Sequence, residues 1–156
     1  MDVEIDTSRL AKHLSAWNRA DSSVPKGWLK TWSKAELAEL SSLSWEVDEG
    51  FADGSLVDRK MKVIVDELEK GSGAVLLKGL SMETFGEGAL GFDKVRELFA
   101  AMVLQVGTPL SQSATGDLML SVRNEAFGKD DSRTRGPNTN RRLSFHTDRC
   151  DVIAFL

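Results

Sequence analysis

The chain has 156 residues, enough for one domain with a hydrophobic core. Apolar residues make up 41% and charged residues 28%, a globular composition that argues against a disordered chain. A formal net charge of −4 argues against a broad nucleic-acid-binding surface, because such surfaces are rich in Lys and Arg.

The N-terminal sequence MDVEIDTSRL is acidic and lacks the apolar stretch of a secretory signal. No apolar run approaches the length of a membrane span. Cys150 is the single cysteine, which excludes an internal disulfide and a cysteine-based zinc site. We therefore expect a reducing compartment such as the cytoplasm, with neither a membrane nor a nucleic acid as partner.

A capping box predicts the first clear helix. In Ser33-Lys34-Ala35-Glu36, the serine oxygen can accept from the amide three residues on, while Glu36 reaches back to the cap amide. Trp32 and Leu37 are spaced for the hydrophobic contact that accompanies such a cap. We expect this helix to fade near Ser44.

Apolar stripes at helical spacing predict two further helices. The stripe of DRKMKVIVDELEKG consists of Met61, Ile64, Val65 and Leu68, between Asp58 as N-cap and Gly71 at the C-terminal end. The stripe of DKVRELFAAMVLQVG consists of Val95, Leu98, Phe99, Met102 and Val103, between Asp93 as cap and Gly107 at the end.

Four stretches are predicted to be strands. Ala74 to Leu77 form a short apolar run between glycines, and LMLSVRNE alternates Leu118, Leu120 and Val122 with other side chains. A polar loop over 126–141 follows, long enough to be functional or mobile. RRLSFHTD and the apolar DVIAFL complete the chain as strands.

A polar face on the RRLSFHTD strand holds the candidate chemistry. Successive side chains of a strand alternate between faces, so Arg142, Ser144, His146 and Asp148 would lie on one side. An imidazole and a carboxylate on one face can occupy adjacent positions around one octahedral metal ion. The pair alone is a weak signal, because a surface or hydrogen-bonded polar pair is the commoner meaning of His-x-Asp.

The wider stretch VRNEAFGKDDSRTRGPNTNRRLSFHTDRCDVIAFL resembles the Fe(II)/2-oxoglutarate-dependent dioxygenases of the taurine dioxygenase-like (TauD/TfdA) family. In that family a strand, a long loop and a phrase like FHTD precede an apolar strand. GSGAVLLKGL resembles its first core strand, and FAAMVLQVGTPL resembles its helix followed by a G-x-P turn. The order matches across roughly residues 70 to 156.

The resemblance implies an α+β fold, an incomplete double-stranded β-helix (jelly roll) with N-terminal and flanking helices. Residues 1–70 would form a helical segment, and residues 71–156 the first part of the jelly-roll core of one dioxygenase domain. It implies Fe(II) bound by His146 and Asp148, 2-oxoglutarate as cosubstrate, and hydroxylation of a small molecule.

The family's third iron ligand and its 2-oxoglutarate arginine lie far downstream and have no counterpart here. His13, the other histidine, is expected on a helix surface. The chain therefore resembles the N-terminal portion of a longer protein, and we expect it to be inactive alone.

Alternatives remain open for the function and for individual residues. The chain could be a non-catalytic α/β binding or interaction module in which the His-x-Asp pair is structural, or, less favoured, a metal-dependent hydrolase. Arg142 could hold an anionic group of the substrate, although a solvated arginine is the commoner case. Cys150 is interpreted as a buried inert thiol, and Arg123 and Asn124 as structural residues at a strand end.

Overall fold

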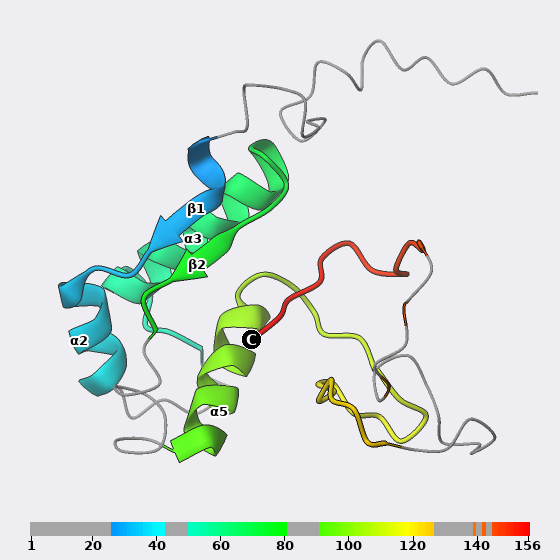
Figure 1. Cartoon of the computed structure of the whole chain (residues 1–156). Coiled ribbons are helices and arrows are strands. Elements are labelled where there is room, and N and C mark those ends of the chain that lie inside the picture. Colours follow the sequence, from blue (N-terminus) through cyan, green and yellow to red (C-terminus); the bar gives the residue numbers. More distant parts are fainter. Residues whose placement is uncertain (1–25, 43–49, 81–90, 127–138, 140–141, 143–144) are drawn as a thin grey trace, which may run out of the picture. The chain divides into compact units, whose positions relative to one another are not determined.

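The computed structural model describes residues 26–42, 50–80, 91–126, 139, 142 and 145–156 (Figure 1). The chain divides between Val106 and Gly107 into two compact units, which are described separately. The elements of the first unit are η1 (Lys26–Trp28), β1 (Leu29–Thr31), α2 (Lys34–Ser42), α3 (Leu56–Lys70), β2 (Leu76–Lys78) and α5 (Gly91–Leu104). Within the described ranges, no helix is long and apolar enough to cross a membrane.

β1 and β2 form a two-stranded parallel sheet in the first unit. Leu29 lies opposite Leu76, and the Trp32 N–H continues the pairing by donating to the Lys78 carbonyl at 2.9 Å. Parallel neighbours need a long crossover connection, which here contains α2 and α3 (Figure 1). The strand predicted at Ala74 to Leu77 is confirmed, but it begins two residues later, at Leu76.

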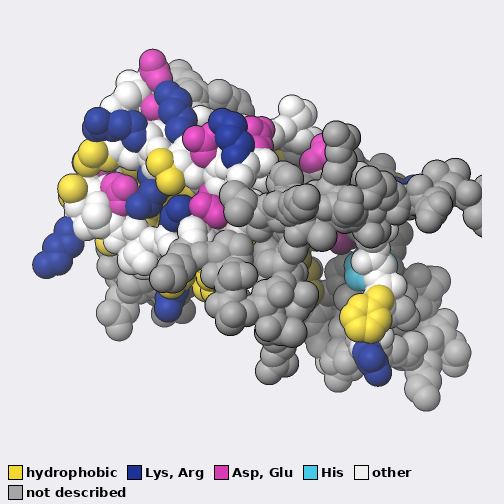
Figure 2. Space-filling model, turned by 90° about the horizontal axis from the view of Figure 1, so that it is seen from above, with side chains coloured by type: hydrophobic (Ala, Val, Ile, Leu, Met, Phe, Trp, Pro, Cys, Tyr) yellow, Lys and Arg dark blue, Asp and Glu magenta, His cyan; other side chains and the backbone are white. Residues whose placement is uncertain are grey.

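The core of this unit joins all three α-helices to the segment after β1. Its buried apolar side chains are Trp32, Leu40, Phe51, Val57, Met61, Ile64, Val95, Leu98, Ala101 and Met102. The predicted stripes of α3 and α5 are thus confirmed as the core-facing sides of their helices, except that Val65 and Val103 are only half-buried and lie outside this core. The face of this unit that is seen from above carries interspersed basic and acidic side chains (Figure 2).

The predicted capping box of α2 is confirmed. The Glu36 N–H donates to the Ser33 hydroxyl at 3.3 Å, and the Ser33 N–H donates to the Glu36 carboxylate at 2.6 Å. Two N–H groups that lack helical partners are thereby satisfied. Both parts of the box come from four adjacent residues, which is why the sequence alone could predict it.

The predicted start of α3 at Asp58 is wrong, because Ser55 is the N-cap. The Asp58 N–H donates to the Ser55 hydroxyl at 3.0 Å, and the Asp58 carboxylate accepts from the Gly54 N–H at 2.8 Å. Ser55 therefore caps the helix about one turn earlier than expected, and the Asp58 side chain reaches back past the cap to Gly54. The carboxylates of Asp53 and Asp58 raise the pKa of Lys62 to about 12.

The α5 boundary is also earlier than predicted. The helix begins at Gly91, so Asp93 lies in the first turn instead of at the N-cap. A carboxylate there still interacts favourably with the positive end of the helix dipole. Gly91 has a φ of +72°, a conformation that glycine adopts without the steric cost of a side chain.

A carboxylate from α2 satisfies the N-terminus of α3. The Leu56 and Val57 N–H groups donate to the two oxygens of Glu39 at 3.0 and 2.9 Å. These hydrogen bonds, that of Val57 foremost, hold the pKa of Glu39 below its ordinary value. The bonds fix α2 against the first turn of α3, and no short-range sequence pattern indicates them.

Glu67 links the end of α3 to β1 and to the turn that follows α3. Its carboxylate accepts from the Ser72 N–H at 2.9 Å and the Ser72 hydroxyl at 2.8 Å, and it pairs with the Lys30 ammonium at 3.5 Å. The Ser72 hydrogen bonds hold the pKa of Glu67 below its ordinary value. Gly27 and Gly71 leave room for this carboxylate, since a Cβ at either position would overlap it.

Lys60 makes a second link, between α3 and the segment from β1 to α2. Its ammonium donates to the Thr31 carbonyl at 2.9 Å, pairs with Glu36 at 3.1 Å and lies 5.8 Å from the centroid of the Trp32 ring. Burial raises the pKa of Glu36, but the Ser33 hydrogen bonds and the Lys60 ammonium outweigh it, so this pKa lies below its ordinary value.

The second unit, Gly107–Phe155, has neither helix nor strand in its described residues. The strands predicted for LMLSVRNE, for the described part of RRLSFHTD and for DVIAFL are therefore wrong as elements of this structure. A strand needs a neighbouring strand for its hydrogen bonds, and alternation of side chains supplies none. Phe145 is 101% exposed, and Val122 is 71% exposed.

The expected jelly-roll core stays a prediction, as does the assignment of the chain to one domain. Most of the predicted loop over 126–141 lies outside the described residues. His13 also lies outside them. What the structure provides for the second unit is the local conformation of its described segments, including the one that holds His146 and Asp148.

Candidate metal site

His146 and Asp148 lie side by side in an irregular segment. The distance from His146 Nε2 to Asp148 Oδ2 is 3.8 Å, with the two side chains 55% and 49% exposed. The juxtaposition expected from their i, i+2 spacing is present, although the strand that was to produce it is not. The pair is thus open to solvent and to ions from solution.

The separation of the two donor atoms can be compared with what a metal ion requires. For metal–ligand bonds of about 2.1 Å, adjacent ligands of an octahedral ion lie about 3 Å apart. The observed 3.8 Å exceeds that by an amount that side-chain rotation can close. An imidazole nitrogen and a carboxylate oxygen also match the donor types of a mixed N,O site.

A complete metal site is not assembled in the part of the chain that the structure describes. Among those residues, no group of three or more His, Cys, Asp or Glu side chains could hold a metal ion. Within that part of the chain, the pair consists of two candidate ligands, His146 and Asp148.

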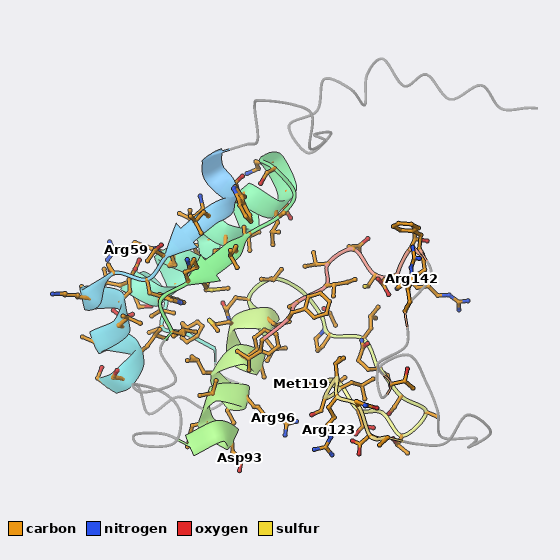
Figure 3. All side chains as sticks on the ribbon, in the orientation of Figure 1. Arg59, Asp93, Arg96, Met119, Arg123 and Arg142 are labelled. Atoms are coloured by element: carbon orange, nitrogen blue, oxygen red, sulfur yellow. The ribbon has the colours of Figure 1, made fainter. Side chains whose placement is uncertain are left out.

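Arg142, the candidate substrate-binding residue, is exposed, and its side chain extends outward from the chain (Figure 3). Ser144, expected on the same face, lies outside the described residues. Of the four residues predicted to share a polar face, the structure brings together His146 and Asp148. Arg142 is an exposed cation earlier in the chain.

The interpretation of Cys150 as a buried thiol is wrong, since the residue is exposed. The side chains of the apolar run that follows Cys150 are exposed as well: Val152 is 45% and Phe155 is 83% exposed. An exposed thiol near a candidate metal pair is accessible to reagents, and this accessibility can be measured.

Arg123 and Asn124 make local contacts, but the strand end at which they were expected is not formed in the described residues. The Arg123 guanidinium pairs with the Glu125 carboxylate at 2.5 Å, and the Ala126 N–H donates to the Asn124 side-chain oxygen at 3.0 Å. Ala126 has a φ of +56°, and the Asn124 hydrogen bond helps to fix this turn.

Sequence reasoning missed a polar cluster around Asp117. Its carboxylate accepts from the hydroxyls of Ser113 and Thr115 at 2.5 and 2.7 Å, and these bonds hold the pKa of Asp117 below its ordinary value. The Gln112 N–H also donates to the Asp117 carbonyl at 2.6 Å, so the cluster closes a turn. The Ser-x-Thr-x-Asp spacing in the sequence could have indicated it.

Comparisons with known proteins give one curated similarity. FR-33289 synthase of Streptomyces rubellomurinus (strain ATCC 31215) is 27% identical over 153 residues, which cover 91% of this chain and 44% of that protein. The chain thus spans less than half the length of the relative it matches. No family model matches the chain, and no solved structure matches it.

Proposed function

We propose that this chain is the N-terminal part of an Fe(II)/2-oxoglutarate-dependent dioxygenase of the taurine dioxygenase-like family, which hydroxylates a small molecule. In this proposal His146 and Asp148 are two of the iron ligands. The observation that carries the proposal is their 3.8 Å donor separation in a solvent-accessible segment. Similarity over most of the chain to a protein named as a synthase supports an enzymatic role.

The residues of this chain would contribute positioning and charge. A neutral His146 offers one nitrogen lone pair, and an ionised Asp148 offers a negatively charged oxygen, so together they balance part of the charge of a divalent cation. Arg142 would attract an anionic group of the substrate. When bound, Fe(II) would supply the activation of dioxygen, in which one oxygen atom converts 2-oxoglutarate to succinate and CO2 and the other hydroxylates the substrate.

The proposal includes the fold. Residues 71–156 would contribute the first part of a jelly roll, and the exposed apolar side chains of the second unit would be covered within it. Leu118, Leu120 and Val122 alternate with other side chains as the strands of such a core require, and they are 57%, 42% and 71% exposed here. A cytoplasmic location stays a prediction.

We expect the 156-residue chain to be inactive, because a triad of two histidines and one carboxylate needs a second histidine near the pair. The only other histidine is His13. The test is succinate formation from 2-oxoglutarate by the purified chain with Fe(II), compared with a blank without protein. The proposal predicts no succinate above the blank, and sustained turnover would contradict the assignment of the missing ligands.

A non-catalytic interaction module is the second candidate function. The observation that favours it is that the described residues bring no third metal-binding side chain to the pair. In such a module His146 and Asp148 would be a half-exposed polar pair with no affinity for metal. A metal titration that gives the same curve for the native chain and for His146→Ala would support this candidate over the dioxygenase.

A further inference from the structure

We draw no further inference here: the strongest candidate, the exposed apolar face that Leu29 and Leu76 form on one side of the β1–β2 sheet, carries none because nothing in the described residues shows what covers it.

Discussion

Replacing Leu98 by Ala tests whether α5 belongs to the core of the first unit. Leu98 is 1% exposed, and it lies in the cluster formed by α2, α3 and α5. Truncation removes three carbon atoms from this cluster and leaves a cavity. Buried Leu→Ala changes cost about 2–5 kcal/mol, the sum of a transfer term and a cavity term. Since native domains are stable by about 5–15 kcal/mol, such a loss is readily measured.

Leu104→Ala is the matched control. It makes the same chemical change in the same helix, at a side chain that is 38% exposed. Because little enclosed cavity forms there, we expect a loss of no more than about 1 kcal/mol. The difference between the two variants therefore isolates the packing of α5, since their helix propensities largely cancel.

The assay is urea unfolding followed by tryptophan fluorescence, because Trp32 is 4% exposed in the same core. We expect Leu98→Ala to lower the urea midpoint clearly more than Leu104→Ala, with similar slopes for both. Equal losses from the two variants would refute the packing of α5 described above. A loss at Leu104 that exceeds the loss at Leu98 would place the opposite face of the helix against the core.

Three further predictions address the links and the exposed thiol. The Ser72 hydrogen bonds lower the pKa of Glu67 from 4.5, so the stability that the Glu67 carboxylate contributes is present above pH 4.5 and is lost as the pH falls through the lowered value. The stability difference between the native chain and Glu67→Gln should therefore shrink on acidification from neutral pH. A difference that stays constant would argue against the link that Glu67 makes to Ser72. Gly27→Ala should destabilise the chain by displacing the Glu67 carboxylate, whereas Gly107→Ala should be tolerated because its Cβ would meet no atom within 4 Å. In a double-mutant cycle, the loss of stability caused by Gly27→Ala should largely disappear when Glu67 is replaced by Ala. Cys150 should react with a thiol reagent in the folded chain about as fast as in urea, and strong protection would show that it is buried.

Local patterns in the sequence predicted the helices of the first unit well. The stripe of α5 became a buried face with Val95 at 5% and Met102 at 7% exposure, because helical periodicity and burial are properties of one segment. The start of α3 was missed although the signal was present. Ser55 precedes Asp58 at capping-box spacing, but the acidic residue was chosen as the cap.

Interactions between distant segments could not be predicted in the same way. Lys30 and Glu67 are 37 residues apart, and no pattern in either segment identifies its partner. The strands predicted in the second unit failed for the same reason: alternation describes one strand, while a sheet also needs a neighbour. β2 was correctly predicted as a strand, but its parallel pairing with β1 was not.

The candidate site was predicted in part. The i, i+2 spacing of His146 and Asp148 was enough to bring their side chains together, even in irregular backbone. Their exposure could not be predicted, since it depends on which segments cover them. Arg142 was expected beside the pair on a common strand face, and without the strand nothing in the sequence fixes its distance from His146.

The most direct test of the central claim is a proton NMR titration of the chain with Co²⁺, a paramagnetic ion that prefers the same donor types as Fe(II). The sequence contains only His13 and His146, so the imidazole signals can be assigned with the two His→Ala variants. We predict that low Co²⁺ concentrations broaden or shift the His146 signals selectively, and that Asp148→Ala abolishes this selectivity while Asp151→Ala does not. Equal effects on both histidines, or no effect on His146, would contradict the proposal that His146 and Asp148 form half of a metal site.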